Sequence, residues 1–88
     1  MRTYMFWFPD DMTDEELEIV VGNATEAIGY ALHEKECEAK GAEFYNEGWG
    51  VDASNTEISI ASKTSKGILT TNYDSSTGKV EHDWEATE

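Results

Sequence analysis

The stretch between Thr13 and Gly41 constrains this chain most, because it carries the start signal, the apolar period and the stop signal of one long helix. Thr13 and Glu16 have the spacing of a capping box, in which each side chain accepts a hydrogen bond from the backbone N–H of the other residue. Gly41 suits the left-handed turn that ends many helices. The sequence therefore predicts a helix over about residues 14–40.

The apolar positions of this segment predict which face of the helix meets the core. At 100° per residue they fall within an arc of roughly 120°. They are Leu17, Val20, Val21, Ala24, Ile28, Ala31, Leu32 and Ala39. Ile19, Tyr30 and Cys37 project to the opposite side, with His33 close by, and we interpret them as a possible contact surface outside the core.

An alternative is two helices joined at Gly22. Gly22 and Asn23, followed by Glu26, repeat the pattern of a helix end and a new cap. The apolar phase continues across Gly22, which favours one helix, either straight or bent at Gly22.

Five segments have the composition of β-strands: residues 3–8, 42–51, 56–61, 67–73 and 79–85. The first is aromatic on both faces and is expected in the middle of a sheet. Turns are expected at 52–55, 62–67 and 74–78. The order β-α-β-β-β-β predicts a single two-layer α+β domain over residues 1–88, with one long helix packed on a mostly antiparallel sheet of four to five strands.

Two of the strands have clear faces. Ile58 and Ile60 are expected inward, with Glu57 and Ser59 outward. In the last strand Val80, His82 and Trp84 share one face, and Glu81, Asp83 and Glu85 share the other. Trp49, between two glycines, is expected at a bend that leaves its ring partly free, either as a core residue or as a binding residue.

The charge balance limits the partners. The chain has 19 acidic and six basic residues among 88, a net charge of −13. Binding to nucleic acid or to an anionic membrane needs clustered Lys and Arg, so both are unexpected. Such acidity makes a basic protein the expected partner.

Composition also bears on compartment and chemistry. The apolar run at residues 4–8 is too short for a signal peptide, and one cysteine cannot form an internal disulfide, so we expect a cytoplasmic protein. Cys37 and His33 are four residues apart, but a zinc site needs further Cys or His ligands. We see no nucleophile motif and no phosphate loop. The sequence therefore predicts no enzyme, no metal and no cofactor.

Two functional hypotheses follow. The first is a decoy whose carboxylates imitate nucleic-acid phosphates and occupy the basic groove of a nucleic-acid-binding protein. Carboxylates two residues apart on a strand lie about 6.6 Å apart, near twice the axial phosphate step of one DNA strand. The expected partner-binding residues are Asp10, Asp11, Asp14, Glu15, Glu18, Glu26, Tyr30, Trp49, Glu81, Asp83 and Glu85, with Trp7 or Trp84 as further aromatic anchors. In size and charge the chain resembles the small inhibitors that phages and mobile elements use against restriction or CRISPR nucleases.

The second hypothesis is an interaction or self-assembly module whose acidity serves solubility. A homodimer would then form through Ile19, Tyr30 and Cys37, or through an open sheet face. In that reading the acids on the last strand only keep an edge strand from aggregating.

Overall fold

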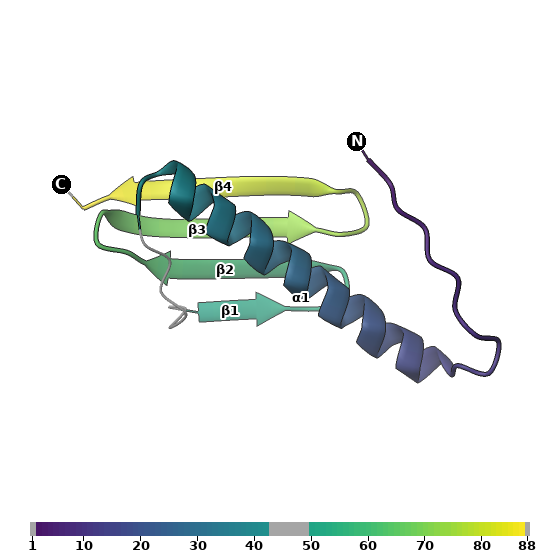
Figure 1. The fold of residues 1–88 in the computed structure, drawn as a ribbon. Helices are drawn as coiled ribbons and strands as arrows, with labels where there is room; N and C mark the ends of the chain where they lie inside the picture. The colour runs from purple at the N-terminus through teal and green to yellow at the C-terminus, as the bar shows by residue number, and fades with distance from the viewer. Residues whose placement is uncertain (1, 43–49, 88) are drawn as a thin grey trace.

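The computed structural model describes residues 2–42 and 50–87. A single helix, α1 (Asp14–Ala39), lies diagonally across one face of a four-stranded antiparallel sheet (Figure 1). The strands are β1 (Gly50–Ala53), β2 (Glu57–Lys63), β3 (Gly67–Asp74) and β4 (Lys79–Ala86), in the spatial order β1-β2-β3-β4. The predicted α+β class and the helix packed on an antiparallel sheet are confirmed.

Both ends of α1 form as the sequence predicts. Thr13 Oγ1 accepts from the Glu16 N–H at 3.1 Å, and the Thr13 N–H donates to Glu16 Oε1 at 3.2 Å. At the other end Gly41 has φ 66°, the left-handed conformation that suits glycine. The helix continues through Gly22 without a break, so the single helix is confirmed.

The strand predicted at residues 3–8 is wrong. This segment is extended, but it pairs with no strand in the described part of the chain. Its large side chains are 44–88% exposed: Tyr4, Met5, Phe6, Trp7 and Phe8. The rings of Tyr4 and Phe6 stack on each other at 5.2 Å. Alternating aromatic residues favour an extended backbone, but a strand also needs a neighbour for its hydrogen bonds, and local sequence does not supply one.

The predicted core face of α1 is also wrong. The side that meets the sheet carries Thr25, Gly29, His33 and Cys37, all buried, at a spacing of four residues. The predicted stripe instead remains largely open: Val20, Val21 and Ile28 are 38–43% exposed, Ala24, Ala31 and Ala39 are exposed, and Leu17 and Leu32 are half-buried. Cys37, expected on an outer contact surface, is 0% exposed.

Small residues explain this choice of face. A Cβ added to Gly29 would overlap Cγ2 of Ile58, so the absent side chain lets α1 approach β2 closely. The hydroxyl of Thr25 lies 2.8 Å from the carbonyl oxygen of Asn55, which ties α1 to the turn after β1. Bulky aliphatic side chains would hold the helix further from the sheet.

The sheet contributes most of a small core. Ile58 and Ile60 of β2 and Leu69 of β3 are buried under α1, which confirms the predicted inward positions on β2. The predicted strand at 42–51 lies mostly outside the described residues, and so does Trp49. Asp52 belongs to β1, so the turn predicted to begin there begins instead at Ser54. In the described residues no helix has the length and apolar character to cross a membrane.

Candidate functional site

The side of the sheet away from α1 carries a group of carboxylates. Alternate residues of a strand point to opposite faces, and paired residues of neighbouring strands share a face. The strand register therefore defines a helix-free face, on which the charged side chains are Asp52, Glu57, Asp74, Glu81, Asp83 and Glu85 against Lys63 and Lys79. The ladder brings together carboxylates that are distant in sequence.

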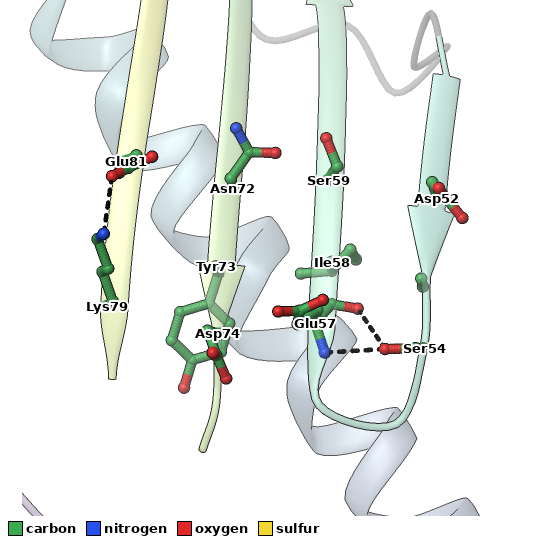
Figure 2. Close-up of a pocket in the computed structure, with 11 residues that line it drawn as sticks. Asp52, Ser54, Glu57, Ile58, Ser59, Asn72, Tyr73, Asp74, Lys79 and Glu81 are labelled. Carbon is green, nitrogen blue, oxygen red and sulfur yellow. Dashed lines mark hydrogen bonds and ion pairs between the residues drawn. The ribbon is translucent and has the colours of Figure 1, made fainter. Parts of the chain in front are cut away.

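The middle of the helix-free face is a polar row across all four strands. Asp52 pairs with Ser59, Ser59 with Asn72, and Asn72 with Glu81. Figure 2 shows these side chains on the side of the strands away from α1. They line an open depression of about 460 Å³ together with the neighbouring row that contains Glu57, Asp74 and Lys79.

Local hydrogen bonds hold several of these groups in place. Ser54 Oγ accepts from the Glu57 N–H at 3.2 Å, which fixes the start of β2. Asp74 Oδ1 accepts from Ser76 Oγ at 2.6 Å and from the Ser76 N–H at 2.9 Å. These hydrogen bonds lower the pKa of Asp74, so its carboxylate is charged at neutral pH. Lys79 Nζ lies 3.1 Å from Glu81 Oε1 and neutralises part of one charge.

The structure divides the predicted partner-binding residues into two groups. Glu81, Asp83 and Glu85 lie on the helix-free face along the edge strand β4. Asp10 and Asp11 lie before α1, and Asp14, Glu15 and Glu18 lie in the end of α1 that projects past the sheet beyond β1 (Figure 1); Glu26 is exposed further along α1. The helix group and the strand group therefore do not form one surface.

Sequence reasoning missed Asp52, Glu57 and Asp74. Each lies at or near a strand end, where an acidic residue in the sequence is normally interpreted as part of a turn. The antiparallel register is the signal that could have found them. When Ser59 of β2 pairs with Asn72 of β3, the same ladder pairs Glu57 with Asp74.

Three of the predicted aromatic anchors are not on this face, and the fourth, Trp49, lies outside the described residues. Tyr30 is 39% exposed on α1, and Trp7 is 88% exposed in the segment before it. Trp84 is half-buried on the helix side of β4, with Lys40 Nζ 5.9 Å from its ring centroid. The helix-free face is therefore polar, and charge and hydrogen bonds dominate what it can recognise.

A second group of polar side chains lies between α1 and the sheet. His33 Nε2 lies 2.7 Å from Ser62 Oγ, and His33 Nδ1 lies 2.7 Å from Thr71 Oγ1. Thr71 Oγ1 also lies 2.9 Å from His82 Nδ1, and His82 Nε2 lies 3.6 Å from Glu36 Oε2. These five side chains form a continuous row from β2 through α1 and β3 to β4 and back to α1.

Counting the available protons assigns the donor and the acceptor of each hydrogen bond in this row. The Thr71 hydroxyl has one proton and two imidazole neighbours, so it donates to one and accepts from the other. With both imidazoles neutral, the Glu36 carboxylate favours the proton on His82 Nε2. Thr71 then donates to His82 Nδ1, His33 donates to Thr71, and Ser62 donates to His33 Nε2. Each hydrogen bond in the row has one donor and one acceptor.

The row joins the two layers and does not form an open reaction site. Ser62, His33 and Thr71 are each 0% exposed, so no substrate reaches the Ser62 hydroxyl in this conformation. Burial, and then Glu34 and Glu36, raise the pKa of Cys37, so it is a thiol at neutral pH. Over residues 2–42 and 50–87 no group of three or more His, Cys, Asp or Glu side chains is arranged to hold a metal ion.

Fold and surface together define a small two-layer α+β domain with one sheet face covered by a helix and the other face open and acidic. Comparison with protein-family models, with curated proteins and with solved structures finds no match.

Proposed function

We propose that this protein is an inhibitor that binds a basic, nucleic-acid-binding surface of another protein through its helix-free face. The observation that supports this most is the gathering of six carboxylates against two lysines on that face: Asp52, Glu57, Asp74, Glu81, Asp83 and Glu85 against Lys63 and Lys79. A protein that neutralises phosphates with Lys and Arg attracts a fixed array of negative charge in the same way.

The spacing of the charges also supports the proposal. Residues two apart on β4 lie about 6.6 Å from one another, and neighbouring strands lie about 4.8 Å apart. A net charge of −13 steers association with a cationic surface over distances of about a Debye length, roughly 10 Å at 0.1 M salt. The target class is then a restriction or RNA-guided nuclease or a similar cytoplasmic enzyme, and the chain itself is no enzyme and needs no cofactor.

Inhibition of DNA cleavage by a panel of such nucleases tests the proposal. The main variant is Glu81→Gln, Asp83→Asn and Glu85→Gln, which removes three charges from the helix-free face. The control is Glu15→Gln, Glu18→Gln and Glu26→Gln, which removes three charges from α1. Each variant has a net charge of −10, since −13 + 3 = −10.

The two variants are expected to differ although their charge is equal. The β4 variant should lose at least tenfold in inhibition, and the α1 variant should lose less than about threefold. Inhibition by the wild type should weaken steeply between about 50 and 200 mM salt. Equal losses in both variants, or inhibition that salt leaves unchanged, would exclude the helix-free face as the binding surface.

A further inference from the structure

The outer side of α1 carries an aliphatic stripe that the fold leaves open. We define the aliphatic stripe as Leu17, Val20, Val21, Ala24, Ile28 and Ala31. It points roughly 150° away from the residues that meet the sheet, counted at 100° per residue. No charged residue between Leu17 and Leu32 falls within its arc. This is the most continuous apolar pattern on α1, and it lies outside the core.

The solvent-accessible surface of the protein is also larger than that expected for a folded monomer of this mass. Its accessible surface is 6639 Å², whereas a monomer of 9.9 kDa is expected to have about 5,200 Å². Its radius of gyration is 14.8 Å, against about 12 Å for 88 residues. The extended aromatic segment contributes part of the excess. The aliphatic stripe contributes another part, because Val20, Val21 and Ile28 are 38–43% exposed.

The aliphatic stripe is complementary to a second copy of itself. In an antiparallel pair centred on Ala24, residue n faces residue 48 − n. Val20 then packs on Ile28 of the other copy, and Ala24 packs on Ala24. Leu17 faces Ala31, so a large side chain meets a small one at each end. The alanine at the centre lets the two backbones approach closely.

Charge favours the same arrangement. Lys35 lies about five turns after Leu17 on the same line of the helix. It is exposed, and within the described residues it makes no ion pair at 4.0 Å or less. In the antiparallel pair it faces residue 13 of the other copy, next to Asp14. Each end of the pair thus places a cation beside the acidic first turn of the other helix.

We infer that two copies of this chain associate through the aliphatic stripe as an antiparallel, two-fold homodimer. The helix-free face of each copy lies on the far side of its sheet and stays open, so the two acidic faces are kept apart. The inference does not depend on the proposed function. If both hold, the dimer is bivalent, and its avidity for an oligomeric target exceeds that of one face.

Mass measurement in solution tests the interface. Sedimentation equilibrium up to about 1 mM should give twice the 9.9 kDa monomer mass. Val20→Asp should raise the dissociation constant of the dimer at least tenfold. Ile19 is 63% exposed but lies outside the aliphatic stripe, so Ile19→Asp should change the dissociation constant less than about twofold. A wild type that remains 9.9 kDa over this range, or equal effects of the two variants, overturns the inference.

Cross-linking tests the two-fold centre and does not rely on a disruptive variant. Ala24→Cys should form an intermolecular disulfide under mild oxidation, because a two-fold axis brings this residue next to its copy. Asn23→Cys, about 100° away on the helix, should not. Equal cross-linking of both variants contradicts the two-fold pairing.

A charge exchange tests the predicted end contact. Lys35→Glu should weaken the dimer about threefold to tenfold, and adding Asp14→Lys should restore it. Circular dichroism checks that α1 remains intact in each variant. Failure of the double variant to recover association contradicts the antiparallel register.

Discussion

His33 is a fully buried ionisable side chain that links the two layers of the protein. Ser62 on β2 and Thr71 on β3 lie at 2.7 Å from its two ring nitrogens. Burial, and then the neighbouring His82, lower the pKa of His33. The folded state therefore holds a neutral imidazole, and protonation acts against the contact between α1 and the sheet.

This gives a prediction for the pH dependence of stability. The folded pKa of His33 is below its unfolded value of about 6.5, so below that pH the unfolded state binds more protons. The contribution of neutral His33 to the free energy of unfolding is fully present above about pH 6.5, and it is lost as the pH falls towards the folded pKa of His33. One proton contributes up to about 1.4 kcal/mol per pH unit. Urea unfolding between about pH 7.5 and 5.5 should show this slope in the wild type.

His33→Gln is the control, because it keeps a polar side chain and removes the titration. The variant is expected to be less stable at pH 7.5, with a smaller loss between pH 7.5 and 5.5. All other ionisable groups are the same in both proteins, so the difference between the two slopes reports His33 together with its coupling to His82. Equal slopes would show that its ionisation is not linked to folding.

Sequence reasoning placed His33 and Cys37 on the outer side of α1 for a specific physical reason. Hydrophobic periodicity weights Leu, Val and Ile, and it gives little weight to a stripe of Thr, Gly, His and Cys. The buried stripe is recognisable only together with its partners, Ser62 and Thr71, which lie on two different strands. A pattern within one helix cannot contain that information.

At the scale of elements, the close approach of α1 to β2 depends on Gly29. Its position against Ile58 leaves no room for a Cβ. A Cβ added at Gly22, two turns earlier, would lie 3.3 Å from the flexible Asn55 side-chain oxygen and 3.9 Å from the Asn55 Cα, which is an ordinary contact distance. The two glycines therefore make a matched pair within one helix.

Gly29→Ala and Gly22→Ala are expected to have opposite effects on the free energy of unfolding. Alanine favours a helix over glycine by about 1 kcal/mol at both positions. At Gly29 the overlap with Ile58 costs more than this, so a net loss of about 1–2 kcal/mol is expected. At Gly22 a gain of up to about 1 kcal/mol is expected. Urea unfolding of both variants measures the difference, and a stabilising Gly29→Ala would contradict the close packing.

Elements fixed by local signals were predicted well. The capping box at Thr13 and Glu16 is formed, and the turn at 74–78 contains Gly78 with φ 76°. Residues 3–8 show the limit of such signals. Their alternation describes an extended chain, and whether it joins a sheet depends on a free edge elsewhere.

For the whole molecule, the sequence gives the amount of charge but only part of its distribution. Alternation along β4 alone places Glu81, Asp83 and Glu85 on one face. Asp52 and Glu57 join that face because of the register of three hairpin-connected strand pairs, which a single strand does not reveal. The acids of the α1 N-terminus were expected to belong with β4, and the diagonal path of α1 separates them.

This distribution predicts how salt changes stability. Neighbouring positions on the helix-free face lie about 5–7 Å apart along and across the strands, well within a Debye length of roughly 20 Å at 20 mM salt. Raising NaCl to about 500 mM shortens that length to a few ångströms and should stabilise the fold by about 1 kcal/mol. Urea unfolding at low protein concentration measures this without a contribution from association.

The variant Glu81→Gln, Asp83→Asn and Glu85→Gln tests whether charge clustered on the helix-free face destabilises the fold more than charge spread along α1. It should be more stable than the wild type at 20 mM NaCl and gain less from added salt. The variant Glu15→Gln, Glu18→Gln and Glu26→Gln removes equal charge from α1, but Glu15 also loses a favourable interaction with the helix N-terminus. It should therefore gain less stability at low salt than the β4 variant. Equal gains in stability would mean that charge repulsion destabilises the fold through net charge alone. The acids of β4 would then repel their neighbours no more than the acids of α1 do.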